Sequence, residues 1–317
     1  MKTARLKFAV VREDPGIELM LVGHTQARRA LVVCSGGCTA LTLAARCPSL
    51  EVTAFDISAA QLEHLARKTE AVERREHQRL GVDTAGGLNQ SGEFEGLFAV
   101  LRHFIETFVA RDVTIADYFS RRRAPRAAVE AWTSSPYWST AFALAFSDSL
   151  LLTIFGPDAI QHAEPGSYPS YFQKVFEGGL SQDDGPSNPF LQHILLGYYL
   201  AGDAPEYCLS GRSLSVTPFH GSLTEVPELS SFDLISLSNI FDWSDDTIVE
   251  VWAEALRRQA NEGAVVVFRQ LNNQRNLRPF FGAEFRFDTG LGQELLSRDR
   301  SLFYNRIEVA TRVSSGG

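Results

Sequence analysis

Residues 31–56 (LVVCSGGCTALTLAARCPSLEVTAFD) decide the fold class of this chain of 317 residues. The apolar run Leu31–Cys34 predicts a short strand, and a glycine-rich turn follows it at Ser35–Gly37. Thr39–Arg46 has the spacing of a helix, and Glu51–Phe55 predicts a second strand. Strand, glycine turn, helix and strand in this order form a βαβ unit, in which the two strands must be parallel.

Runs of aliphatic and β-branched residues further along the chain predict more strands of the same sheet. They lie at Leu214–Thr217, Phe232–Leu237 and Ala264–Arg269, with a helix predicted over Asp246–Gln259. Two more runs, Glu284–Asp288 and Leu302–Thr311, predict a terminal antiparallel pair. Seven strands in this order favour a doubly wound α/β sheet.

Residues 81–205 do not continue the alternation of strands and helices. The turn-rich segment Gly81–Gly92 separates them from the first βαβ unit, and helical patterns such as Leu97–Ala110 follow. A loop of this length without secondary structure does not fit a compact domain. We therefore predict an α/β core built from residues 1–80 and 206–317, and a large helical insert, 81–205, that binds a second substrate.

One apolar segment of the insert approaches the length that spans a bilayer. Trp138–Phe155 (WSTAFALAFSDSLLLTIF) has 18 residues, but Asp148 lies within it. A charged residue inside a membrane is costly, so we expect a buried helix and no transmembrane segment.

The composition is that of a folded protein, with 44% hydrophobic and 21% charged residues. A formal net charge of −8 argues against a general nucleic-acid-binding face, which would need an excess of basic residues. Four cysteines are too few for a disulfide scaffold, and no charged and apolar leader opens the sequence. We therefore expect a cytoplasmic enzyme.

The glycine turn and the acid after the second strand are the strongest local signal for a ligand. Gly36 and Gly37 stand where glycine lets a ligand approach the backbone, and Asp56, 21 residues after Ser35, stands where an acid accepts hydrogen bonds from ribose hydroxyls. The G-x-G-x-x-G fingerprint that serves a pyrophosphate is absent, which disfavours NAD and FAD. A nucleoside without phosphates fits better, and S-adenosylmethionine is the commonest of these. A purely structural turn, with Asp56 or Ser58 as a helix cap, is the alternative.

A second group of polar and aromatic residues follows the predicted strand Phe232–Leu237. In an open α/β sheet this loop faces the same crevice as the glycine turn, so we expect Ser238, Asn239 and Phe241 to contact the cofactor. A turn that caps the next helix is the alternative. By position alone, Gly221, Ser222 and Leu223, after the preceding strand, are expected at the edge of the adenine.

Cys34 and Cys38 do not complete a metal motif. Radical enzymes with an iron–sulfur cluster need a third cysteine, but Leu41 occupies that position. We expect both cysteines to be small buried side chains, and no metal is predicted. The sequence also lacks H-E-x-x-H, G-x-S-x-G and P-loop motifs, so it gives no support to metal hydrolysis, esterase or kinase-like chemistry.

Taken together, the motifs resemble those of the betaine-lipid aminocarboxypropyltransferases. The cofactor segment of that family has a serine-glycine-glycine turn, a strand that ends in Asp and a short turn to Gln, which match Ser35–Gly37, Asp56 and Gln61. Further motifs recur in the expected order, namely Arg12–Pro15, Asn188–Leu191, Phe241–Trp243 with Trp252, Val267–Arg269, and Arg298–Ser301 with Tyr304. Ser58 and Ala59 depart from the family, which usually has Asn and Pro there.

The resemblance implies a class I methyltransferase-like (Rossmann-like) fold that transfers the 3-amino-3-carboxypropyl group of S-adenosylmethionine and releases methylthioadenosine. It also implies that Ile57 and Gln61 contact the cofactor. The family's acceptor is the lipid diacylglycerol. Related chemistry modifies a phenolic oxygen of nocardicin-type antibiotics. The net negative charge of the chain and the lack of a basic membrane-docking helix suit such a small-molecule hydroxyl at least as well as a lipid.

An acceptor hydroxyl must lose its proton as the new bond forms. His162, Tyr168 and Asp242 are the candidate bases, and Tyr168, Tyr171 and Phe172 are expected either to line the acceptor pocket or to pack inside the insert. An ordinary methyltransferase is the main alternative, because nothing in the sequence fixes which carbon of the sulfonium faces the acceptor. A non-catalytic module that binds S-adenosylmethionine is a further alternative, and a dehydrogenase comes last.

Overall fold

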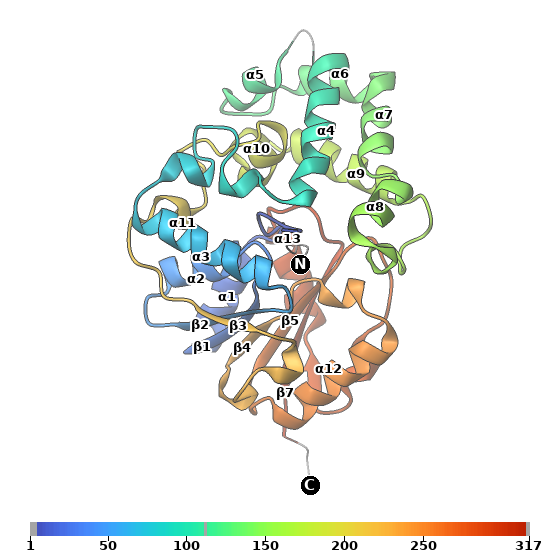
Figure 1. The fold of residues 1–317 in the computed structure, drawn as a ribbon. Helices are drawn as coiled ribbons and strands as arrows, with labels where there is room; N and C mark the ends of the chain where they lie inside the picture. The colour runs from blue at the N-terminus through green and yellow to red at the C-terminus, as the bar shows by residue number, and fades with distance from the viewer. Residues whose placement is uncertain (1–4, 111–112, 315–317) are drawn as a thin grey trace.

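The computed structural model describes residues 5–110 and 113–314 (Figure 1). Its centre is a seven-stranded sheet in the order β3-β2-β1-β4-β5-β7-β6. The first five strands in this order are parallel, and β7 runs antiparallel to both β5 and β6. The strands are β1 (Arg29–Val33), β2 (Glu51–Asp56), β3 (Thr217–His220), β4 (Leu234–Ser236), β5 (Val265–Gln270), β6 (Phe285–Phe287) and β7 (Arg306–Arg312). This order is that of a class I methyltransferase-like, Rossmann-like sheet, so the predicted fold class is confirmed.

Two predicted strands begin in the wrong place. The run Leu214–Thr217 does not form a strand, and β3 begins at Thr217 and includes Pro218. β3 lies at the edge of the sheet, where a residue without an N–H is tolerated. The run Leu302–Thr311 is also shorter as a strand, because Leu302 has a φ of 70° and breaks the extended backbone before β7.

Helices cover both faces of the sheet (Figure 1). Side chains from α1, α2, α3, α11 and α13 share one hydrophobic core with one face, and side chains from α12 share a second core with the other face. Because both faces are buried, successive residues of a strand such as β1 enter different cores. These helices are α1 (Gly16–Thr25), α2 (Cys38–Arg46), α3 (Ala59–Glu73), α11 (Glu206–Leu209), α12 (Asp246–Gln259) and α13 (Thr289–Arg298).

The α-helices between α3 and α11 form a third hydrophobic core, rich in aromatic side chains. They are α4 (Glu93–Phe108), α5 (Ile115–Phe119), α6 (Arg126–Thr133), α7 (Pro136–Ala145), α8 (Asp148–Phe155), α9 (Tyr168–Ser181) and α10 (Pro189–Leu195). Phe303, from the chain just before β7, packs into the same core against Phe98 and Phe172. We call this group of helices the insert. It sits above the carboxyl ends of the parallel strands (Figure 1).

The apolar stretch of the insert is not the single buried helix that we expected. It forms two helices, α7 and α8, separated at Phe146 and Ser147. The stretch Pro136–Phe155 is long and apolar enough to cross a membrane by length and composition alone, with a mean hydropathy of 1.4, and 33% of its most apolar part is buried. Trp138 and Phe142 face the core, whereas Leu144 and Leu152 are exposed. The break follows from Ser147 and Asp148, which favour a helix start over a continuous helix.

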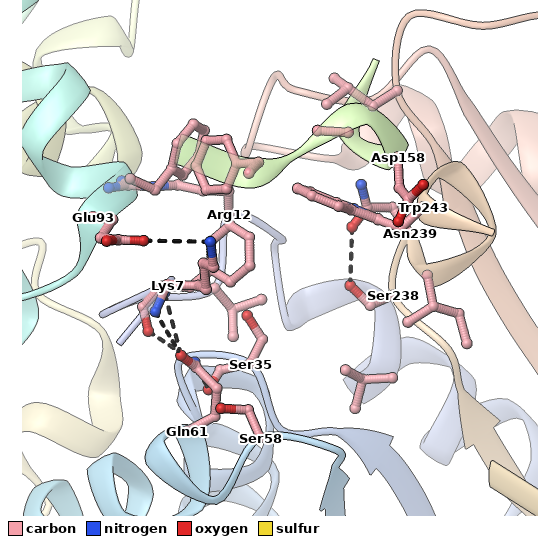
Figure 2. A pocket seen from close by; sticks show the side chains of 18 of the residues that line it. Lys7, Arg12, Ser35, Ser58, Gln61, Glu93, Asp158, Ser238, Asn239 and Trp243 are labelled. Atoms are coloured by element: carbon pink, nitrogen blue, oxygen red, sulfur yellow. Dashed lines mark hydrogen bonds and ion pairs between the residues drawn. The ribbon is translucent and has the colours of Figure 1, made fainter. Parts of the chain in front are cut away.

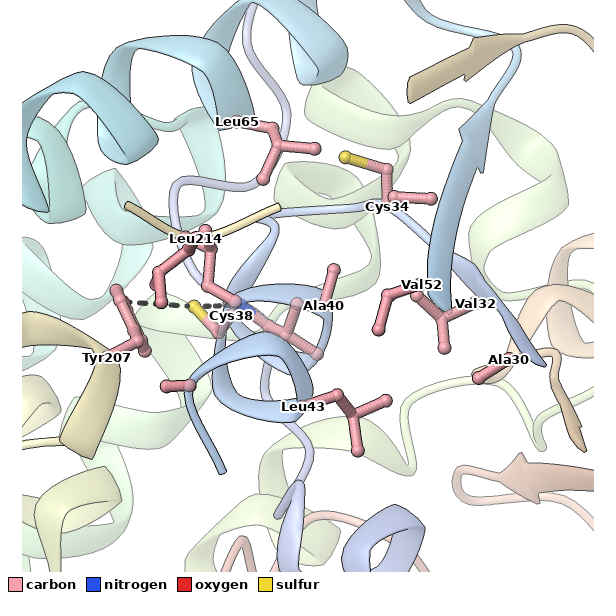
Figure 3. Close-up of a cluster of buried hydrophobic side chains, with 14 of the residues drawn as sticks. Ala30, Val32, Cys34, Cys38, Ala40, Leu43, Val52, Leu65, Tyr207 and Leu214 are labelled. Atoms are coloured by element: carbon pink, nitrogen blue, oxygen red, sulfur yellow. Dashed lines mark hydrogen bonds between the residues drawn. The ribbon is translucent and has the colours of Figure 1, made fainter. Parts of the chain in front are cut away.

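The two cysteines after β1 are buried, as predicted, with 1% of Cys34 and 7% of Cys38 exposed. Figure 3 shows both of them in the hydrophobic core, with Cys38, the first residue of α2, beside Tyr207. The Sγ atom of Cys38 also accepts a hydrogen bond from the Nζ atom of Lys68 at 3.1 Å. Within the described ranges, no three or more His, Cys, Asp or Glu residues are grouped so that they could hold a metal ion.

Candidate functional site

A cavity of about 950 Å³ lies between the carboxyl ends of the parallel strands and the insert. The core contributes residues at or just after the ends of β1, β2 and β4, which include Ser35, Asp56, Ile57, Ser58, Gln61, Ser238, Asn239 and Ile240. The insert and the chain before β7 contribute mainly apolar and aromatic residues, which include Phe94, Leu151, Ile154, Phe155, Ile160, Tyr168, Phe172, Phe303 and Tyr304. Most polar side chains of the cavity wall therefore come from the strand ends and the N-terminal segment, whereas the insert contributes mainly apolar ones. Figure 2 shows several of the polar residues.

Asp56 ends β2 and lines the cavity. Its two carboxylate oxygens accept hydrogen bonds from the backbone N–H groups of Ser35, at 3.0 Å, and Ser58, at 2.9 Å. Burial raises the pKa of Asp56, and the two N–H donors act against that shift. Ser58, not Asp56, stands at the cap position of α3. Each oxygen of Asp56 keeps a further lone pair with which it could accept a hydrogen bond from a ligand.

The glycine turn is closed by the chain itself. Gly36 contacts the backbone of Val10, and a Cβ at Gly36 would lie 2.5 Å from the Val10 Cα. Gly37 has a φ of 77° at the start of α2, and its missing Cβ would meet Leu65. Ser35 lines the cavity, whereas the two glycines do not. The open backbone that we expected at Gly36 is therefore filled by the N-terminal segment.

The side chain of Gln61 holds the N-terminal segment in place through hydrogen bonds to its backbone. Its side-chain oxygen accepts hydrogen bonds from the N–H groups of Lys7 and Phe8, at 3.1 and 3.3 Å. Its nitrogen donates to the carbonyl oxygens of Phe8 and Ser35, at 2.9 and 2.5 Å. Gln61 lines the cavity, as Figure 2 shows, but its amide is occupied by these backbone groups. A cofactor contact of Gln61 stays a prediction.

The loop after β4 places only some of the predicted residues at the cavity. Ser238, with a φ of 55°, and Asn239 line it. Phe241 is fully buried and packs edge-on against Phe268 in the core, away from the cavity. Asp242 is also buried and does not line the cavity.

Asp242 links the loops that follow β4 and β5. Its carboxylate accepts hydrogen bonds from the Leu271 N–H at 2.8 Å, from the Asn273 amide at 2.6 Å and from the Asn239 amide at 3.3 Å. Burial raises its pKa to about 7, against the effect of these hydrogen bonds. These contacts fit a group that fixes two loops, and a role of Asp242 as a base stays a prediction.

His162 and Tyr168 lie in the insert. The Nε2 atom of His162 is 2.9 Å from the Ser244 carbonyl oxygen, to which it donates, and His162 does not line the cavity. Tyr168 does line the cavity, but its hydroxyl donates to the Ala159 carbonyl oxygen at 3.2 Å. Burial raises the pKa of Tyr168, which disfavours the tyrosinate that a base would need.

The predicted adenine-edge segment lies outside the cavity wall. Ser222 and Glu225 form a reciprocal capping box at a short 3₁₀ turn, and Leu223 is fully buried. Gly221 follows the edge strand β3, and none of the three predicted residues lines the cavity. Nearer the cavity, Ile57 is 73% exposed although it lines the wall, so it offers an open apolar surface.

Three carboxylates that line the cavity were not singled out from the sequence, and one of them is Glu93 at the start of α4. Glu13 is buried, with 3% of its side chain exposed, and Asp158 lies in the short 3₁₀ helix η3 (Pro157–Ala159) of the insert. Figure 2 shows Asp158 on the side of the cavity opposite Ser58 and Gln61. The motif Arg12–Pro15 contains Glu13, but a short irregular segment carries no periodicity that shows where its side chains point.

No protein-family model matches the sequence, and no curated protein matches it. Two similar solved structures are crystal structures of a mutant of MtNAS, one of them in complex with S-adenosylmethionine. The complex is 13% identical with a TM-score of 0.23, and the other structure is 11% identical with a TM-score of 0.20. Each comparison covers 78% of this chain and 98% of the other chain. Because both TM-scores are low, we base the fold class on the strand order of the sheet alone.

Proposed function

We propose that this protein transfers the 3-amino-3-carboxypropyl group of S-adenosylmethionine to an acceptor hydroxyl and releases methylthioadenosine. The observation that carries the proposal is a single cavity that joins the strand ends, with Asp56, to the apolar wall of the insert. In open α/β sheets, ligands bind at the carboxyl ends of the strands. One cavity with two different walls suits two substrates that must react with each other.

The wall at the strand ends suits a nucleoside without a pyrophosphate. Asp56 keeps lone pairs for the ribose hydroxyls, and the exposed side chain of Ile57 offers a surface for the adenine. A pyrophosphate would need open backbone N–H groups at the glycine turn, but Val10 covers Gly36. S-adenosylmethionine has a ribose and an adenine but no pyrophosphate, so it suits this wall, whereas a dinucleotide does not.

The chemistry of the proposed step is a substitution at carbon. The acceptor oxygen attacks the γ-carbon of the methionine arm, and the bond between that carbon and sulfur breaks. The electron pair stays on sulfur, so the positively charged sulfonium leaves as a neutral thioether, methylthioadenosine. The proton of the acceptor hydroxyl goes to a base, and we propose Asp158, a carboxylate of the insert that lines the cavity.

The wall of the insert points to an acceptor with an apolar body. Leu151, Phe155 and Phe172 line this side of the cavity. Apolar walls of this kind bind apolar or aromatic molecules, with a few polar groups that fix orientation. We propose a hydroxyl carried by such a body, as in a nocardicin-type phenol or in diacylglycerol.

The product nucleoside tests the proposal. The purified protein would be incubated with S-adenosylmethionine and, in parallel, with phenolic acceptors, with diacylglycerol in detergent micelles and with a cell extract. Mass spectrometry then identifies the nucleoside. Methylthioadenosine that appears only with an acceptor would support the proposal. S-adenosylhomocysteine would replace it with methyl transfer, and binding without either product would indicate a non-catalytic module.

A further inference from the structure

Three charged side chains form a buried cluster beneath the cavity. Arg269, at the end of β5, donates to both oxygens of Glu18 in α1, at 2.7 and 3.1 Å. The same guanidinium lies 3.1 Å from Glu13. Arg269 and Glu18 are fully buried, and Glu13 is the only member of the cluster that lines the cavity.

The charges of this cluster do not balance. Glu18 already binds Arg269 through two parallel hydrogen bonds, which is the geometry that satisfies a guanidinium best. One guanidinium therefore faces two carboxylates, and an excess negative charge remains on Glu13. Burial raises the pKa of Glu13, Arg269 lowers it, and the Glu18 carboxylate raises it further.

The other groups around Glu13 do not remove this charge. The hydroxyl groups of Ser238 and Tyr304 both donate to its Oε1 atom, the latter at 3.4 Å, but neither carries a positive charge. The neighbouring Arg12 has its own buried partner, Glu95, at 3.0 Å. A buried carboxylate that shares its only cation with a second carboxylate is costly, so Glu13 either holds a proton or binds a cationic group of a ligand.

The order of the strands places Glu13 at a suitable distance from Asp56. β2 and β4 flank β1, so their ends lie two strand spacings apart, about 10 Å. Asp56 ends β2, and Ser238, which donates to Glu13, follows β4. In S-adenosylmethionine, an extended chain of about six bonds joins the ribose to the amino group and reaches about 7 Å, and the ribose ring adds to this length.

We propose that Glu13 binds the ammonium group of the methionine arm and thereby holds the arm across the ends of β1 and β4. This inference rests on the proposed function, since it takes S-adenosylmethionine as the ligand. The arm supplies the cation that the cluster lacks. Glu13 is thus the residue that distinguishes the whole cofactor from nucleosides without an amino group.

Binding measurements with three nucleosides test this role of Glu13. Isothermal titration calorimetry would compare the wild-type protein with Glu13→Gln, which keeps the shape and removes the charge. We expect Glu13→Gln to bind S-adenosylmethionine and S-adenosylhomocysteine about tenfold to hundredfold more weakly. Methylthioadenosine has no amino group, so its affinity should change less than about twofold. Its binding also shows that the variant is folded.

Two control variants separate this effect from general changes in the cavity. Glu93→Gln also removes a carboxylate from the cavity wall, and it should leave the ratio of the three affinities as in the wild type. Asp56→Ala should weaken the binding of all three nucleosides to a similar degree, because all of them carry the ribose. An equal loss of all three in Glu13→Gln, or no loss at all, would overturn the inference. A loss for S-adenosylmethionine alone would also overturn it, since S-adenosylhomocysteine lacks only the sulfonium.

A ligand analogue tests the same point without a substitution. S-adenosylmethionine with hydrogen in place of its amino group should bind the wild-type protein at least about tenfold more weakly than the natural compound. Equal affinity would overturn the inference while leaving the proposed function intact. A wild-type protein that binds none of these nucleosides would overturn the proposed function, and the role of Glu13 with it.

Discussion

The backbone of Val10 lies directly against Gly36, so that a Cβ at Gly36 would stand 2.5 Å from the Cα of Val10. Lys68, fully buried in α3, donates from its Nζ atom to the carbonyl oxygens of Gly36 at 2.7 Å and Ala9 at 3.2 Å, and so joins the two segments. The N-terminal segment thus closes the glycine turn and carries Glu13 into the cavity wall. The turn therefore positions a part of the site that is distant in sequence.

Substitution of Gly36 by Ala should be strongly destabilising. The new methyl group would overlap the Val10 backbone, and overpacking of this kind costs about 1–3 kcal/mol of unfolding free energy. Urea unfolding followed by circular dichroism would measure the change. Gly178→Ala in α9 is the matched control, because nothing lies within 4 Å of its missing Cβ, and it should be neutral or slightly stabilising. Equal stability of the two variants would contradict the contact between Val10 and Gly36.

Asp56→Asn should weaken the binding of nucleosides that carry a ribose. The carboxylate holds the N–H groups of Ser35 and Ser58, and the proposed ribose contacts would use its remaining lone pairs. An amide has only one acceptor oxygen, so we expect a loss of about 1–3 kcal/mol in the binding free energy of methylthioadenosine. Calorimetry would measure it, and an unchanged affinity would remove Asp56 from the ribose site.

The arrangement of the core could be predicted because it depends on periodic hydrophobic runs. The βαβ unit around Ser35–Gly37 and the helix α12, Asp246–Gln259, lie where the pattern places them. Strand β3 was misplaced because Pro218 interrupts its pattern, which only an edge position allows. A sequence pattern shows which residues are buried, but not which strand stands at the edge.

The site was less predictable because several of its residues lie in irregular backbone. Glu13 and Asp158 stand in short segments without a hydrophobic period, so their orientation depends on tertiary contacts alone. Position along the sheet correctly brought Asp56, Ser238 and Asn239 to one cavity. Residues a few positions further on, such as Phe241, turn back into the core, and no local signal marks that change.

Asp158→Asn should slow the transfer step without weakening the binding of the cofactor. If Asp158 takes the proton of the acceptor, its loss should lower the rate of methylthioadenosine release by about 10²-fold or more. The affinity for S-adenosylmethionine should stay within about twofold, since Asp56 and Glu13, the residues proposed to hold the ribose and the ammonium group, lie outside the insert that carries Asp158. Glu130→Gln, an exposed carboxylate on α6, is the control for a general effect of charge. A variant with the wild-type rate would exclude Asp158 as the base.

The unfolding free energy should depend on pH through Asp242. Its folded-state pKa is raised to about 7 by burial, whereas an Asp in an unfolded chain has a pKa of about 3.9. Between these values the folded state binds the extra proton, so the contribution of Asp242 to stability is complete below about pH 4 and is lost as the pH rises through about 7. Asp242→Asn has no such proton, so its unfolding free energy lacks this dependence on pH. The unfolding free energy of the wild type minus that of the variant should therefore fall as the pH rises from about 4 to about 7. The slope is at most about 1.4 kcal/mol per pH unit. Urea unfolding at several pH values would measure that difference. A difference independent of pH between about 4 and 7 would show that the hydrogen bonds from Leu271, Asn273 and Asn239 keep the carboxylate ionised in spite of its burial.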